Sequence, residues 1–119
     1  MKIAVSSRGT GLDSQIDPRF GRAAYLLIID TVSSEIEVID NAENLNAFKG
    51  AGIQAAALVS DSGAEVLLTG FCGPNAFKTL QAAGVKVAND VTGTVRDALK
   101  ALNEGSVSFA DDANVEGQW

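Results

Sequence analysis

The first forty residues carry short apolar runs of a length typical of β-strands. Residues 2–6 form one such run, and residues 23–30 form the most apolar run of the chain, which predicts a strand buried on both faces. Residues 35–40 alternate polar and apolar side chains, as a half-exposed strand does. The residues between these last two runs, 31–34, predict a hairpin turn, so we expect the two strands to pair antiparallel.

From residue 51 on, the pattern changes to helices that alternate with short strands. Apolar residues at helical spacing predict three helices, the first with Ile53, Ala56 and Ala57 on its apolar side. Each helix ends near a glycine, a common residue just past a helix C-terminus: Gly63, Gly84 and Gly105. Short apolar runs predict the two remaining strands, at residues 65–69 and 85–87.

The element order is therefore three strands followed by helix, strand, helix, strand and helix. Crossover helices join parallel strands, so we expect a five-stranded mixed sheet of order 3-2-1-4-5, counted along the chain, with the second strand antiparallel and helices on its faces. This α/β arrangement resembles a three-layer ribonuclease H-like fold. Residues 1–105 suffice for it as a single domain, and residues 106–119 form an acidic tail that we expect to be loosely attached.

Composition restricts the chemistry of this domain. The chain has 119 residues, nine Lys and Arg against fifteen Asp and Glu, and no His, which gives a formal net charge of −6. An acidic balance argues against nucleic acid as a partner, and the lack of His excludes Ser-His-Asp triads and imidazole metal sites. No apolar run is long enough to span a membrane, and the N-terminus lacks the apolar stretch of a signal peptide. We therefore expect a cytoplasmic protein with no membrane partner.

Positive charge is concentrated in one predicted loop, residues 6–22. Three of the four arginines of the chain lie there: Arg8, Arg19 and Arg22. In an open α/β sheet, ligands bind beyond the carboxyl ends of the strands where the connections reverse direction, and the loops 44–52 and 70–75 also lead there into helix N-termini. Helix N-termini favour anions, so the sequence predicts an anion site. The alternative is that the arginines are solvated charges that balance Asp13 and Asp17.

Cys72 has two interpretations. As the residue before a predicted helix N-terminus it could be a thiolate of lowered pKa and a ligand for a soft metal. It could equally be a small buried hydrophobe, which is the more common state of cysteines outside disulfides. Because Met1 is the only other soft ligand that the chain offers, a metal site built on this thiol would be a poor one.

No arrangement of residues predicts catalysis. Residues 50–55 match the G-x-G-x-x-A pattern of dinucleotide sites, but the preceding predicted strand ends about ten residues too early. A two-metal nuclease needs carboxylates at the centre of its sheet, and the central strands offer only Glu65, at the wrong end of its strand. A binding module is favoured. A regulatory partner protein and an enzyme that acts on a small anion are the competing classes.

Three motifs, in chain order, carry a resemblance to a known family: residues 17–23 (DPRFGRA), 50–55 (GAGIQA) and 68–77 (LTGFCGPNAF). They resemble the landmarks of the dinitrogenase iron–molybdenum cofactor biosynthesis family, over residues 1–105. The family has a ribonuclease H-like fold, and its members carry metal–sulfur clusters and cofactor precursors. The resemblance therefore implies a carrier rather than an enzyme. The partners that it implies are cluster-accepting proteins or proteins of the cell-division or ATPase type.

Within this family the chain is most similar to a stand-alone branch that carries a molybdenum–copper sulfide cluster without covalent attachment. An iron–molybdenum cofactor or its precursor is the alternative, weakened because members that hold this cofactor through histidine would find none here. The resemblance implies that arginines neutralise the polyanionic cluster at the carboxyl edge of the sheet, while Phe20, Phe71 and Ile53 cover its faces. The residues that we expect at the cluster are Arg8, Arg19, Phe20, Gly21, Arg22, Gly50, Gly52, Ile53, Gly70, Phe71, Cys72, Gly73 and Asn75.

Overall fold

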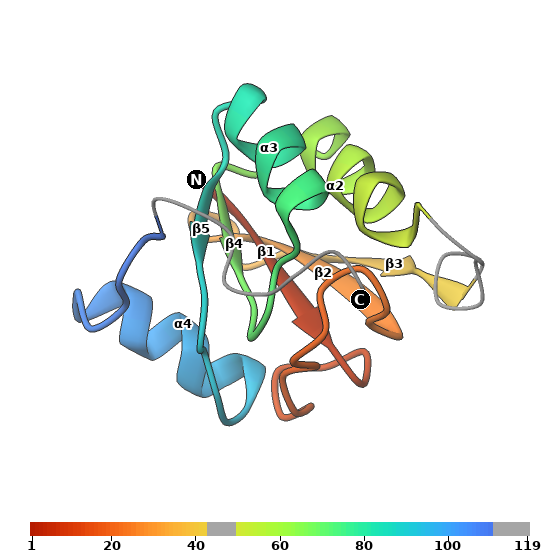
Figure 1. The fold of residues 1–119 in the computed structure, drawn as a ribbon. Coiled ribbons are helices and arrows are strands. Elements are labelled where there is room, and N and C mark those ends of the chain that lie inside the picture. Colours follow the sequence, from red (N-terminus) through yellow and green to blue (C-terminus); the bar gives the residue numbers. More distant parts are fainter. Residues whose placement is uncertain (43–49, 111–119) are drawn as a thin grey trace.

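A five-stranded mixed β-sheet forms the centre of the molecule in the computed structural model, which describes residues 1–42 and 50–110 (Figure 1). The strands are β1 (Lys2–Ser7), β2 (Tyr25–Asp30), β3 (Ile36–Asp40), β4 (Val66–Leu68) and β5 (Lys86–Ala88). They lie in the order β3-β2-β1-β4-β5. Strand β2 is antiparallel to both of its neighbours, and β4 is parallel to both of its own. The predicted sheet is thus confirmed, with strand ends that differ by one or two residues.

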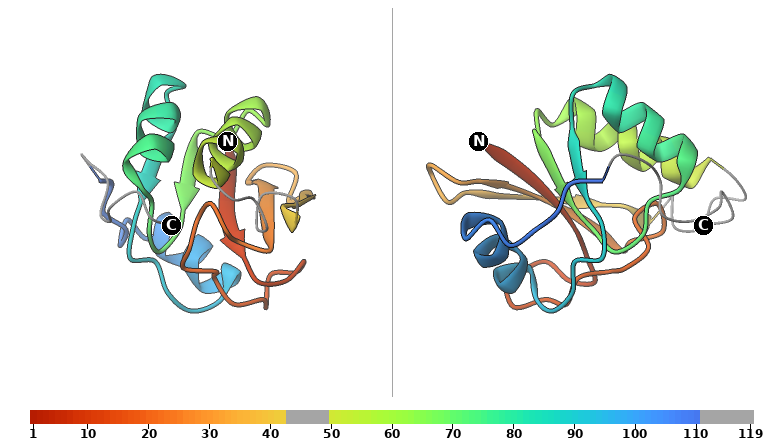
Figure 2. Two further views of the ribbon diagram at one scale, coloured as in Figure 1. Left: turned by 45° about the vertical axis from the view of Figure 1, so that its right-hand side comes forward. Right: turned by 60° about the vertical axis from the view of Figure 1, so that its left-hand side comes forward.

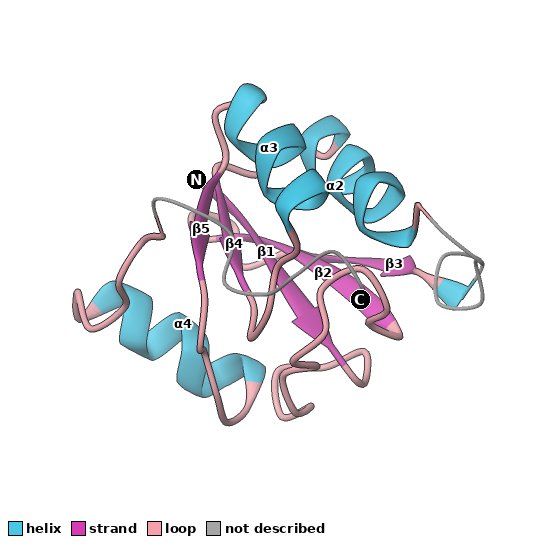
Figure 3. Cartoon of the chain, viewed as in Figure 1, coloured by secondary structure: helices cyan, strands magenta, loops and turns pink. Residues whose placement is uncertain are grey.

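Helices cover both faces of this sheet. They are α2 (Ala51–Asp61), α3 (Pro74–Ala82) and α4 (Val95–Asn103) (Figure 3). Helices α2 and α3 lie side by side on one face, and α4 lies on the other (Figure 1, Figure 2). In β2, Leu26 and Ile28 pack on the α2 and α3 side, while Leu27 and Ile29 pack on the α4 side. All four are at most 5% exposed, so this strand is buried on both faces, as its apolar sequence predicts.

The buried side of α2 differs from the prediction. Its buried side chains are Ala51, Ala55, Ala56 and Val59. Ile53 is 45% exposed and Ala57 is exposed as well, so the predicted apolar side was wrong for these two residues. Small residues let α2 approach α3 closely, since a Cβ added to Gly52 would lie 3.3 Å from the Cβ of Ala76 in α3. The helix therefore turns its alanines inward and leaves Ile53 at the surface.

Helix α4 begins at a capping box formed by Thr94. The backbone N–H of Asp97 donates to Thr94 Oγ1 (3.1 Å), and the backbone N–H of Thr94 donates to Asp97 Oδ2 (3.0 Å). The bond from the Thr94 N–H is the largest cause of an Asp97 pKa below the ordinary value for aspartate. Both orphan donors at the start of the helix are thereby satisfied.

We expect Thr94→Ala to lower the free energy of unfolding by about 1 kcal/mol, because the helix loses its N-cap hydrogen bond. Urea denaturation followed by circular dichroism measures this loss. Thr92→Ala is the matched control, since Thr92 is exposed and precedes the capping box. An equal loss in the two variants would contradict the assignment of Thr94 as the cap.

Residues 107–110 continue from α4 to the outer edge of the sheet. The N–H of Ala110 donates to the carbonyl of Val87 (2.7 Å), and Phe109 forms a β-bridge with Ala88. The Lys86 ammonium lies 5.5 Å from the centroid of the Phe109 ring. This part of the predicted tail therefore packs against β5. The rest of the tail, with Trp119, lies outside the described residues.

In the part of the chain that the structure describes, no helix has the length and apolar character needed to cross a membrane.

Candidate functional site

The loop after β1 and the loop after β4 are joined by backbone hydrogen bonds. The N–H of Phe71 donates to the carbonyl of Pro18 (2.6 Å), and the N–H of Phe20 donates to the carbonyl of Phe71 (3.2 Å). The start of this arginine loop, residues 17–24, is held at the carboxyl end of β1, because the N–H of Asp17 donates to the carbonyl of Ser6 (2.9 Å). Since β1 and β4 are neighbours, the two loops meet where the connections of the sheet change direction.

Two glycines let the first turn of α2 and the loop after β4 pack closely against the arginine loop. A Cβ added to Gly21 would lie 2.7 Å from both the Cα and the N of Gly52, so the arginine loop touches the backbone of the first turn of α2. A Cβ added to Gly70 would likewise lie 2.7 Å from the Cα of Pro18. The arginine loop, the loop after β4 and the N-terminal turn of α2 therefore form one closely packed group, with α3 beside it.

Two helix N-termini open onto this group. Helix α2 begins after Gly50 and α3 begins after Gly73, and within residues 1–42 and 50–110 neither has a side-chain cap hydrogen bond or an acidic residue in its first turn. The N-terminus of α4, by contrast, is satisfied by its capping box. Uncapped N–H groups and the positive ends of two helix dipoles favour a negatively charged ligand here.

Two buried polar side chains hold the arginine loop in shape. The carboxylate of Asp17 accepts hydrogen bonds from the N–H of Arg19 (3.2 Å) and of Ala24 (3.3 Å). The amide of Asn41 donates to the carbonyls of Gly21 (3.3 Å) and Ala23 (2.9 Å). Asn41 is not among the residues predicted from the sequence, and Asp17 is interpreted there only as a charge. The position of Asn41 directly after a predicted strand is the one signal by which it could have been found.

The structure divides the three arginines of the predicted anion site. Arg19 is exposed and Arg22 is half-buried, and both belong to the arginine loop. Arg8 begins a separate segment, residues 8–16, that packs along α4 on the other face of the sheet (Figure 1). The N–H of Val95 and the N–H of Arg96, both in α4, donate to backbone carbonyls of this segment (2.9 and 2.8 Å). The candidate site therefore has two arginines in its loop, and Arg8 lies apart from them.

The predicted site residues differ in burial: some lie in the core and others lie at the surface. Phe20 is 1% exposed and packs in the core between the sheet and α2 and α3, so it supports the loop from beneath. Gly21, Gly70 and Cys72 are buried as well. The predicted residues that are at least partly accessible are Arg19, Arg22, Gly50, Gly52, Ile53, Phe71, Gly73 and Asn75. Residues 44–49 of the predicted site loop 44–52 lie outside the described residues.

Cys72 behaves as a buried hydrophobe in this structure. Its side chain is inaccessible and belongs to the same core cluster as Phe20 and Phe77. Burial raises the pKa of the thiol to about 12, so it is protonated at neutral pH. Within residues 1–42 and 50–110, His, Cys, Asp and Glu side chains form no group of three that could hold a metal ion.

We expect Cys72 to react with a disulfide reagent about a thousandfold more slowly at pH 8 in the folded protein than in guanidinium, because the raised pKa removes the thiolate. The rate of thiol release from Ellman's reagent measures this difference. Similar rates in the two states would mean that the thiol is exposed and ionised, and would restore it as a candidate ligand.

The fold is a small α/β domain in which arginines, glycines and the N-termini of two helices meet at one edge of the sheet. The chain belongs to the dinitrogenase iron-molybdenum cofactor family, whose model matches residues 1–105. Comparison with curated proteins finds no match.

Solved structures agree with this assignment. The apo form of the orange protein from Desulfovibrio gigas is 46% identical to the chain, covers 96% of both chains and superposes with a TM-score of 0.93. A putative NifB protein from Thermotoga is 37% identical over 98% of both chains, with a TM-score of 0.83. A putative dinitrogenase from Methanocaldococcus jannaschii, at 16% identity and a TM-score of 0.69, supports the fold alone.

Proposed function

We propose that this protein carries a polyanionic metal–sulfur cluster of the molybdenum–copper sulfide type, bound non-covalently beside the arginine loop. The observation that carries the proposal is the meeting of Arg19 and Arg22 with two uncapped helix N-termini at one edge of the sheet. In a chain with a net charge of −6, such a place attracts anions through its local positive charge. The orange protein of D. gigas, which is known in an apo form, supports the idea of a removable ligand.

The accessible residues offer charged and apolar contacts to the cluster. Guanidinium groups of Arg19 and Arg22 neutralise the charge of the cluster, and the first N–H groups of α2 and α3 donate to its sulfide or oxide atoms. Ile53 at the start of α2 and Phe71 in the loop after β4 offer apolar surface to the soft sulfide faces. Because the Cys72 thiol is buried and protonated, we assign it no bond to the metal.

A carrier agrees better with these residues than an enzyme does. The site has accessible cations and apolar side chains, and the one nucleophilic thiol lies in the core. A carrier must also release its cargo, which charge and backbone contacts permit more readily than thiolate ligation. We infer that the cluster passes to an acceptor protein.

A carrier of iron–molybdenum cofactor precursor is the second candidate, favoured by the match of the family model over residues 1–105. The two candidates differ in the metal that they bind. Arginines and backbone N–H groups recognise charge and size, so the metals themselves must be measured.

Titration of the protein with tetrathiomolybdate and copper under anaerobic conditions tests the proposal. We expect visible absorption that stays with the protein on gel filtration and saturates at a fixed ratio of metals to chain. A parallel titration with iron and molybdate in sulfide addresses the second candidate. If neither mixture leaves metal on the protein after gel filtration, the proposed function is wrong.

A further inference from the structure

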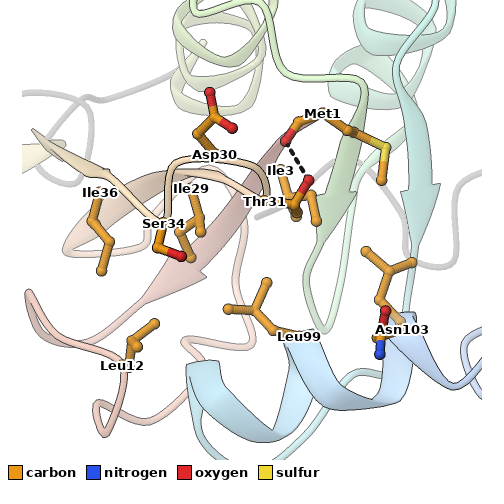
Figure 4. Close-up of a pocket in the computed structure, with 11 residues that line it drawn as sticks. Met1, Ile3, Leu12, Ile29, Asp30, Thr31, Ser34, Ile36, Leu99 and Asn103 are labelled. Carbon is orange, nitrogen blue, oxygen red and sulfur yellow. Dashed lines mark hydrogen bonds between the residues drawn. The ribbon is translucent and has the colours of Figure 1, made fainter.

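A pocket of about 480 Å³ lies between α4 and the β2–β3 hairpin (Figure 4). Its apolar lining residues are Ile3, Leu12, Ile29, Ile36, Leu99 and Leu102. Met1, Asp30, Thr31, Ser34 and Asn103 complete the lining, and the hydroxyl and N–H of Thr31 donate to the carbonyl of Met1 (3.0 and 2.9 Å). A pocket of this size and character accommodates a large apolar side chain or a small apolar ligand.

The pocket exists because α4 covers only part of its face of the sheet. Buried residues of α4, Val95 and Ala98, share a core cluster with residues of β1, β2, β4 and β5, whereas β3 contributes only the partly buried Ile36. The β2–β3 hairpin extends beyond this helix (Figure 2). On the uncovered part, Ile36 is half-buried and Val38 is 43% exposed.

Three exposed apolar side chains belong to the β2–β3 hairpin or lie next to it. Of the large hydrophobic residues that are exposed in the described part of the chain, Met1, Val32 and Val38 are these three, while Ile53 lies in α2 and Phe109 beside β5. Met1 lines the pocket, and Val32, which is 87% exposed, lies in the turn between Thr31 and Ser34. Val38 lies two residues from Ile36 on the same face of β3. Apolar residues clustered around a pocket mark an interaction surface rather than scattered exposure.

Strand β3 adds an open edge and a strong charge. It is the outer strand of the sheet, and its far side pairs with no other strand among the described residues. Residues 30–41 hold four acidic side chains and no lysine or arginine: Asp30, Glu35, Glu37 and Asp40. Pairing two copies through this edge would bring carboxylates of both chains together, which disfavours self-association. The same charges favour a basic partner.

We propose that β3 and the adjacent pocket, together the β3 docking surface, bind an extended basic segment of another protein. The segment pairs with β3 as a sixth strand through backbone hydrogen bonds, and its lysines or arginines lie near Glu35 and Glu37, on the opposite face from Ile36. An apolar side chain of the segment enters the pocket beside Ile36, the residue that belongs to both the strand and the pocket. Main-chain pairing supplies affinity, while the pocket and the acidic side chains supply specificity.

The pocket lies at the opposite end of the sheet from the arginine loop. The β2–β3 turn contacts Met1, just before the start of β1, whereas the arginine loop follows the end of β1 and accepts hydrogen bonds from Asn41, just after the end of β3. A partner side chain in the pocket therefore leaves the anion site open. The inference rests on the pocket, the edge and the charges alone, so it stands independently of the proposed cluster.

The test is a titration of the ¹⁵N-labelled full chain with a ten-residue synthetic peptide that alternates leucine and lysine, followed by NMR. We expect shift changes in β3, in the turn 31–34 and in Leu99–Asn103. A peptide with glutamate in place of lysine leaves these signals unchanged. The double variant Glu35→Lys/Glu37→Lys weakens binding of the lysine peptide about tenfold or more, because two attractions become repulsions.

Glu65→Lys is the control variant for charge. Glu65 is exposed and precedes β4, on the far side of β1 from β3, so this change keeps the affinity for the peptide. The proposal is overturned if the lysine peptide shifts no signal of the β3 docking surface or if the glutamate peptide binds equally well. It is also overturned if the same signals shift with protein concentration alone, because a second copy of the chain would then occupy the surface.

Discussion

Replacing Arg19 and Arg22 together with alanine is expected to abolish retention of a thiomolybdate–copper cluster while the fold persists. Both side chains are at least partly accessible in the arginine loop, so neither is part of the core. A hydrogen bond to a charged group contributes about 1.5–3 kcal/mol, so loss of two such contacts weakens binding about a hundredfold to ten-thousandfold. Anaerobic titration and gel filtration measure retention, and circular dichroism reports the fold.

Arg96→Ala is the matched control for charge. Arg96 is also exposed, but it lies in α4, on the other face of the sheet from α2 and α3, in an ion pair with Asp13 (Nε to Oδ1 3.1 Å). It should retain the cluster as the unchanged protein does. Arg8→Ala should resemble this control, because Arg8 lies in the segment that packs along α4. Retention by the Arg19/Arg22 double variant, or equal loss in Arg96→Ala, would contradict the proposed site.

The second large effect is expected from Gly21→Ala. A methyl group at Gly21 would lie 2.7 Å from backbone atoms of Gly52, so the arginine loop and the first turn of α2 must move apart. Overpacking against backbone costs about 1–3 kcal/mol, so we expect the free energy of unfolding in urea to fall by about 2 kcal/mol or more. Cluster binding should weaken as well, because the arginines and the N-terminus of α2 no longer face the same place.

Gly11→Ala is the control for this substitution. No atom lies within 4 Å of a Cβ at Gly11, so the free energy of unfolding should change by no more than about 0.5 kcal/mol. If Gly21→Ala is as stable as the unchanged protein and binds the cluster equally well, the close approach of the loop to α2 is not needed for the site.

The sheet and its order could be predicted because each strand leaves a clear signal. The run at residues 23–30 is apolar at successive positions, and the observed β2 buries them on both faces. Crossover connections then leave few topologies for the later strands. The inner side of α2 was not predictable in the same way. Its packing depends on how closely alanines and Gly52 approach α3, which is a property of the tertiary structure.

The location of the candidate site could be predicted better than the residues that form it. Glycines and arginines at the carboxyl edge of the sheet pointed to the loops that the structure brings together. The sequence could not separate Arg8 from Arg19 and Arg22, because the fold of residues 8–16 along α4 depends on contacts with a helix more than eighty residues later. Burial of Phe20 beneath the loop likewise depends on packing from several elements.

An optical spectrum with elemental analysis, on protein purified without oxygen from its native source, tests the central claim most directly. The polypeptide has one Trp and one Tyr as its main chromophores, and these absorb only in the ultraviolet. The proposed function predicts visible absorption together with molybdenum, copper and sulfide in a fixed ratio to the chain. A colourless, metal-free preparation that also fails to take up thiomolybdate and copper would contradict it.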